Sequence, residues 1–76
     1  MDELVAWIAR QLVDEPDAVR VERVAGEDAT VLRLHVAPGD VGKVIGRQGR
    51  IARALRALVR AASARSDTRL LLEIAE

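Results

Sequence analysis

The 76-residue chain contains no cysteine, which excludes disulfide bonds and cysteine-ligated metal sites. Phenylalanine and tyrosine are also absent, and one tryptophan, Trp7, cannot form a row of stacked aromatic rings. No apolar run approaches the roughly 18 residues that span a membrane, and we expect no signal peptide and no membrane segment. With a single histidine and no catalytic constellation, we expect no metal, no cofactor and no enzymatic activity. The sequence therefore predicts a small cytoplasmic protein with one domain over residues 1–76, because so short a chain cannot support two cores.

The charges cancel overall but are segregated along the chain. Residues 1–39 hold four arginines against eight acidic residues, a net charge of −4. Residues 40–65 hold Lys43 and six arginines against Asp40 alone, a net charge of +6, and residues 66–76 contribute −2. A protein with zero net charge can still attract an anion at its cationic end. That end contains the glycine-rich stretch VGKVIGRQGR, residues 41–50.

Hydrophobic periodicity predicts the order helix, strand, strand, helix, helix, strand. The expected ranges are a helix over 3–13, a hairpin of strands over 18–24 and 29–37, a short helix over 41–45 with Asp40 as N-cap, a longer helix ending near 64–67, and a strand over 68–75. A crossover through two helices favours parallel pairing of the second and third strands. We expect an α+β fold with a three-stranded mixed sheet and all helices on one face.

Apolar side chains at these periods give the expected core. They are Leu4, Val5, Ile8, Leu12 and Val13 on the first helix, Leu32, Leu34 and Val36 on the second strand, Ile51, Leu55, Leu58, Val59 and Ala62 on the long helix, and Leu70, Leu72 and Ile74 on the last strand. For Trp7, off the main stripe, we favour partial burial over a partner contact.

Gly46 and Gly49 predict a sharp turn with Arg47 and Gln48 at its tip. Backbone N–H groups in such a turn, followed by a helix start and flanked by Arg47 and Arg50, suit a phosphate. The spacing excludes a dinucleotide-binding fingerprint, because Val44 occupies the place of its middle glycine. A P-loop is excluded as well, because Arg47 and Gln48 stand where it needs Lys and Ser or Thr.

The segment Val44-Ile45-Gly46-Arg47-Gln48-Gly49 resembles the VIGxxG signature of the KH domain, and the order of elements resembles its type II arrangement. A single type II KH domain of this size resembles the KhpA family of small bacterial RNA-binding proteins. The resemblance implies binding of single-stranded RNA, with bases in a groove between the two helices and the last strand, in an RNA chaperone or post-transcriptional regulator. The implied contact residues are Lys43, Val44, Ile45, Gly46, Arg47, Gln48, Gly49, Arg50 and Arg53.

Two alternatives stay open at this point. The exposed arginines of the long helix, Arg53, Arg56 and Arg60, suit either a solvated face or a phosphate-tracking surface. The neutral overall charge also allows a protein-interaction module with little RNA affinity. Apolar residues off the core stripes, Trp7 and Leu71, motivate self-association, and the family resemblance implies pairing with itself and with a larger KhpB-type protein.

Overall fold

The computed structural model describes residues 1–65 and 67–75. Its elements are α1 (Asp2–Leu12), η1 (Pro16–Ala18), β1 (Arg20–Ala25), β2 (Thr30–His35), η2 (Pro38–Asp40), α2 (Val41–Ile45), η3 (Arg47–Gly49), α3 (Arg50–Ser63) and β3 (Leu70–Ile74). This order confirms the helix and strand assignment from the sequence, and the boundaries agree within about two residues. The predicted end of the long helix near 64–67 includes Ser66, which lies outside the described residues, as does Glu76.

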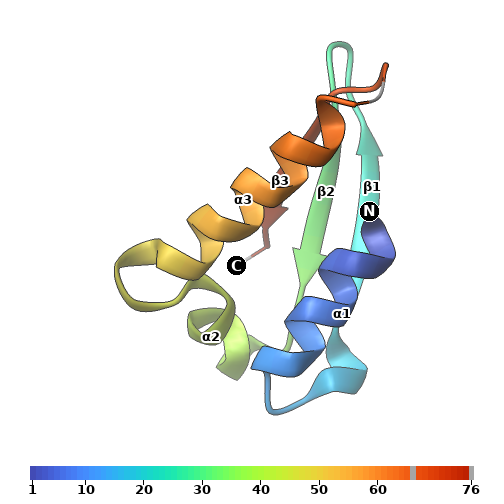
Figure 1. Cartoon of the computed structure of the whole chain (residues 1–76). Helices are drawn as coiled ribbons and strands as arrows, with labels where there is room; N and C mark the ends of the chain where they lie inside the picture. The colour runs from blue at the N-terminus through green and yellow to red at the C-terminus, as the bar shows by residue number, and fades with distance from the viewer. Residues whose placement is uncertain (66, 76) are drawn as a thin grey trace.

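The three strands form one mixed sheet in the order β1-β2-β3. β1 and β2 pair antiparallel, from Arg20 opposite His35 to Ala25 opposite Thr30. β2 and β3 pair parallel, from Thr30 opposite Leu70 to Leu34 opposite Ile74. The crossover between these parallel strands contains α2 and α3, so the predicted topology is confirmed, and α1 and α3 lie across the same face of the sheet (Figure 1).

The core lies between that sheet face and the helices. Its fully buried large side chains come from α1, β2, α2 and α3 and are Leu32, Leu34, Val5, Val44 and Val59. Alternate residues of β3 complete it, because inward and outward side chains alternate along a strand, and these are Leu70, Leu72 and Ile74. The short helix α2 therefore reaches the common core through Val44.

The opposite face of the sheet carries charged side chains. Glu22, Arg33 and Glu73 lie side by side on the three strands. Arg33 approaches Glu22 at 3.9 Å and Glu73 at 3.4 Å, so its charge is matched from both sides. A cross-strand row of opposite charges suits a solvent-facing surface, and it agrees with the prediction that all helices cover one face.

The helix stripes differ in detail from those predicted. Leu4, Leu58 and Trp7 are exposed, with 43%, 38% and 58% of their surface accessible, so the expected core positions of both leucines and the partial burial of Trp7 are wrong. Alanines occupy the contact faces instead, at Ala6 and Ala9 on α1 and Ala52 on α3. Small side chains let a helix backbone approach its neighbour closely. A periodicity that counts mainly large apolar residues places the predicted buried face to one side of these alanines.

Within residues 1–65 and 67–75, no helix has both the length and the apolar character that crossing a membrane requires.

Candidate nucleic-acid interface

A tight loop joins α2 to α3 and projects from the edge of the helical layer (Figure 1). Gly46 has φ 78° and ψ 173°, and Gly49 has φ 73° and ψ 15°, conformations that side chains with a Cβ disfavour. The Gly46 N–H donates to the carbonyl of Gly42 at 2.9 Å, and the Gly49 N–H donates to the carbonyl of Gly46 at 3.1 Å. The sharp turn that the two glycines predicted is confirmed.

Gln48 at the loop tip has φ 57° and ψ 24°, and it is the single non-glycine residue with positive φ in the described part of the chain. Sequence reasoning missed this conformation, because glutamine, unlike asparagine or aspartate, gives no signal for the left-handed region. Three of the four loop residues, Gly46, Gln48 and Gly49, therefore have positive φ.

The start of α3 presents backbone donors beside this tip. Gly49 is its N-cap residue, and no side chain among the described residues caps it. The first N–H groups of a helix have no intrahelical acceptor and carry partial positive charge. An anion placed between the loop tip and the first turn of α3 would meet both the oriented peptide groups and the side chain of Arg50.

Arginines extend this positive surface from the loop along the outer side of α3. They are Arg47, Arg50, Arg53, Arg56 and Arg60, and all five are exposed. In contrast to Arg23, Arg33 and Lys43, none of the five pairs with a carboxylate of the described residues. Uncompensated cations in one row attract a polyanion, whereas paired ones contribute little.

Hollows flank the free edge of β3, where the family resemblance implied a groove. One of about 200 Å³ lies between α3 and β3 and is lined by Arg56, Arg60, Leu70, Leu71 and Leu72. Another of about 390 Å³ lies at the other end of the sheet, near the start of α2, and is lined by His35, Val36, Pro38, Val41 and Ala75. Both have aliphatic walls, and the hollow between α3 and β3 also contains two arginines of the basic side.

Val44 and Ile45 occupy different environments. The Val44 side chain is fully buried in the core, so the expectation that it offers its aliphatic surface to a base is wrong. Residues at i and i+1 point about 100° apart on a helix, and α2 directs Val44 inward. Ile45 is half-buried against the core and keeps part of its surface at the start of the loop.

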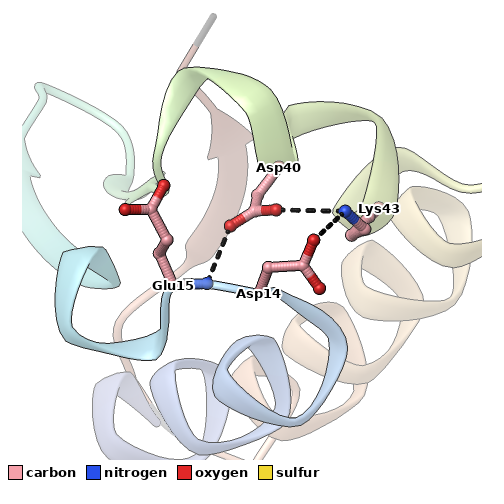
Figure 2. Close-up of polar contacts among 4 residues, drawn as sticks. All are labelled: Asp14, Glu15, Asp40 and Lys43. Carbon is pink, nitrogen blue, oxygen red and sulfur yellow. Dashed lines mark hydrogen bonds and ion pairs between the residues drawn. The ribbon is translucent and has the colours of Figure 1, made fainter.

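Lys43 lies on α2 and is held by two carboxylates (Figure 2). Its Nζ donates to Asp14 Oδ2 at 2.7 Å and to Asp40 Oδ1 at 3.3 Å. Hydrogen bonds first to Asp14 and then to Asp40 raise the pKa of Lys43, so it is a firmly charged group whose charge is locally compensated. Sequence reasoning placed Lys43 with the RNA-contacting residues and did not foresee these partners.

Asp40 occupies the N-cap position of α2, as predicted, but its side chain makes no capping hydrogen bond. The carboxylate turns instead toward the segment after α1, where its Oδ2 accepts from the Glu15 N–H at 3.1 Å (Figure 2). Burial acts to raise the pKa of Asp40, but hydrogen bonds from the backbone of Glu15 and Asp14 and from Lys43 outweigh burial and lower it overall. Asp40 is therefore ionised at neutral pH.

The order of elements, the mixed sheet with helices on one face and the GxxG loop between two helices define a type II KH domain. Residues 2–74 match the KhpA/KhpB KH-domain family, and the chain belongs to that family.

Curated relatives cover almost the whole chain. RNA-binding protein KhpA of Caldanaerobacter subterraneus is 53% identical over 74 residues, which is 97% of this chain and 99% of the relative. RNA-binding protein KhpA of Treponema pallidum is 56% identical over 73 residues, 96% of this chain and 91% of the relative. RNA-binding protein KhpA of Clostridium acetobutylicum is 50% identical over 74 residues, 97% and 99% of the two chains. No solved structure matched.

Proposed function

We propose that this chain, as a single KH domain over residues 1–76, binds single-stranded RNA through the Gly46–Gly49 loop and the basic side of α3. The observation that carries the proposal is the row of five exposed arginines, none paired with a carboxylate of the described residues, that begins at a loop with three positive φ angles. Relatives that share about half of the sequence are named RNA-binding proteins, which supports the same ligand here.

In this proposal the loop fixes the RNA backbone, and the groove receives the bases. Gly46 and Gly49 let the sugar-phosphate chain approach closely, while Arg47, Gln48 and Arg50 donate hydrogen bonds to phosphate oxygens. Arg53 follows one helical turn after Arg50 and extends the phosphate track. Bases then lie against the aliphatic walls near Ile45 and beside β3.

Weak base discrimination follows from the composition. The sole aromatic ring, Trp7, lines a hollow between α1 and β1 together with Asp2, Glu3, Ala6, Arg10 and Val21, on the acidic part of the molecule. Without an aromatic ring in the groove, bases lose the stacking that gives about 1–3 kcal/mol each in other single-strand binders. Backbone contacts dominate, which suits a non-enzymatic RNA chaperone or post-transcriptional regulator in the cytoplasm.

Titration of a single-stranded RNA at two or more salt concentrations tests this proposal. With Arg47, Arg50 and Arg53 each displacing a counterion, log K is expected to fall with log salt at a slope of about −2. A protein-interaction module, the alternative function, would bind RNA negligibly or without this slope. Fluorescence anisotropy of a labelled oligonucleotide measures both quantities.

We also propose that the domain pairs with a second subunit, either a copy of itself or a KhpB-type protein. Exposed Leu4 and Leu58 line an apolar hollow of about 410 Å³ with Met1, Ala61, Ala62 and Arg65. This hollow lies at the end of α3 away from the loop, so a partner there would leave the RNA surface free. Two linked binding surfaces raise avidity by roughly 10² to 10⁴.

Leu58→Glu is expected to convert the self-associated protein to a monomer, because a carboxylate would be buried in an apolar contact. Ala57→Glu is the matched control, since Ala57 is exposed on the same helix but does not line this hollow. Light scattering at high micromolar concentration measures the molecular mass of the wild-type protein and of both variants. A wild-type protein that is monomeric under these conditions contradicts the homodimer and leaves only the heteromeric pair.

A further inference from the structure

A buried carboxylate joins the segment after α1 to the helix that precedes the loop. Asp40 is 3% exposed and is the one charged residue buried in the described part of the chain. Its Oδ2 accepts from the Glu15 N–H, its Oδ1 accepts from Lys43 Nζ, and Lys43 Nζ also donates to Asp14 (Figure 2). We call this set, Asp14, the Glu15 N–H, Asp40 and Lys43, the Asp40–Lys43 clamp.

The clamp acts on an element that has little stability of its own. α2 has five residues, and a helix of that length is not stable in isolation. Its orientation is fixed at two adjacent positions that point in different directions, Val44 into the core and Lys43 into the clamp. The loop starts at Gly46, directly after α2, so a rotation of α2 would carry the loop tip with it.

The charges of the clamp exclude Lys43 from the row of free cations. Two carboxylates, Asp14 and Asp40, lie within ion-pair distance of its ammonium group. If Lys43 turned away to reach a phosphate, the buried Asp40 carboxylate would lose its cationic partner, and an uncompensated buried charge is costly. The arginines of the loop and α3 do not pair with a buried carboxylate, so they can turn toward a phosphate without this cost.

We propose that Asp40 and Lys43 are positioning residues, which hold α2 and the Gly46–Gly49 loop in the RNA-binding geometry, and that Lys43 is not itself a phosphate ligand. This inference rests on the RNA binding proposed above. Simple electrostatics predicts that removing a negative charge near a phosphate site strengthens RNA binding. If Asp40 is a positioning residue, removing its charge weakens RNA binding instead.

Asp40→Asn is the decisive variant, with Asp17→Asn as its matched control. Both change the net charge by +1, but the exposed Asp17 carboxylate makes no hydrogen bond or ion pair with the described residues. Asp40→Asn is expected to bind single-stranded RNA three- to tenfold more weakly than Asp17→Asn, roughly the range that loss of one hydrogen bond spans. Equal or tighter binding by Asp40→Asn overturns the proposal.

Lys43→Met separates positioning from phosphate contact. It is expected to weaken RNA binding without change in the salt slope. The Asp40→Asn/Lys43→Met double variant is expected to bind no more weakly than Lys43→Met, because all three variants break the Asp40–Lys43 contact and Asp40→Asn removes the buried charge that Lys43→Met leaves unpaired. A phosphate ligand would instead reduce the magnitude of the slope by about 0.7. That reduction, or additive losses in the double variant, overturns the proposal.

Amide hydrogen exchange tests the clamp independently of RNA. In Asp40→Asn, faster exchange of the Gly46 and Gly49 amides with unchanged exchange of the Leu32 and Leu34 amides supports local positioning. Uniformly faster exchange at all four amides, or unchanged exchange of the Gly46 and Gly49 amides, overturns the proposal. If the wild-type protein binds no RNA, the proposed function fails, and the exchange result alone decides whether the clamp holds the loop.

Discussion

The Arg47→Asp/Gln48→Asp double variant is expected to lose RNA affinity by about 100-fold or more. Loss of a charge-assisted contact costs about 1.5–3 kcal/mol, and two carboxylates at the loop tip add repulsion toward the phosphates. Both side chains are exposed on the segment that is proposed to lie closest to the RNA backbone. Anisotropy titration with one labelled single-stranded RNA, at the lowest salt used for the wild-type protein, measures the loss.

The fold should tolerate this change. Neither side chain is part of the core, and the left-handed conformation of residue 48, with φ 57° and ψ 24°, is one that aspartate adopts more readily than glutamine. Circular dichroism and the thermal midpoint are therefore expected to stay close to those of the wild-type protein. A variant that is unfolded would not count as evidence for an RNA-contacting loop.

The sequence supplies a closely matched control, because the same dipeptide, Arg10-Gln11, occurs on α1. Arg10→Asp/Gln11→Asp gives the same change in composition and net charge on an exposed surface of the acidic half. Its RNA affinity is expected to fall only by the long-range effect of net charge, a few-fold at low salt and less at high salt. Equal losses in the two double variants would mean that overall charge, and not the loop, governs binding.

Much of the fold follows from local patterns. Three local patterns are each clear within a short stretch of sequence: the alternation in 29–37, the helical period after residue 50 and the glycines at 46 and 49. The crossover rule then leaves one compact arrangement of the strands. The sharp turn at Gly46 and Gly49 was predictable for the same reason, whereas the left-handed conformation of Gln48 between them was not.

The environment of the site was less predictable, because it depends on contacts between distant segments. Lys43 and Asp14 are 29 positions apart, so no periodicity relates them. The carboxylate of Asp40 had a plausible local role as a helix cap, and the competing acceptor role toward the Glu15 N–H exists only after α1 and α2 have packed. Val44 was misplaced similarly, since a motif specifies residue types but not which face of a one-turn helix meets the core.

Gly46→Ala is expected to be the most destabilising single change in the loop, at about 2–6 kcal/mol of unfolding free energy. With φ 78° and ψ 173°, Gly46 occupies a region that is almost restricted to glycine, which costs other residues about 1–3 kcal/mol. A Cβ at this position would also lie 2.7 Å from Ile51 Cγ1, and such overpacking adds about 1–3 kcal/mol. For a domain of this size, that loss is comparable to the whole stability.

Gly49→Ala provides the comparison that separates the two causes. Gly49 has φ 73° and ψ 15°, an ordinary left-handed conformation, and a Cβ there would meet no atom within 4 Å, so its cost is expected to be only about 1–2 kcal/mol. Urea denaturation of both variants gives the difference in unfolding free energy. Equal costs would show that the approach of Ile51 to position 46 contributes nothing.

A double-mutant cycle with Ile51→Ala measures how much of the cost of Gly46→Ala comes from steric contact with Ile51. Ile51→Ala removes Cγ1 and Cδ1, two of the three Ile51 atoms that a Cβ at position 46 would contact, while the contact with the Ile51 Cβ at 3.0 Å and the backbone strain of Gly46→Ala remain. Gly46→Ala is therefore expected to cost about 1–3 kcal/mol less in the Ile51→Ala background than in the wild-type protein, the usual scale of coupling between touching residues. No coupling would show that the Ile51 Cγ1 and Cδ1 atoms contribute nothing to the cost of Gly46→Ala. With or without coupling, the fold is expected to require Gly49 less than Gly46. RNA affinity lost in a folded Gly49→Ala variant therefore reports on how closely the RNA backbone approaches the loop.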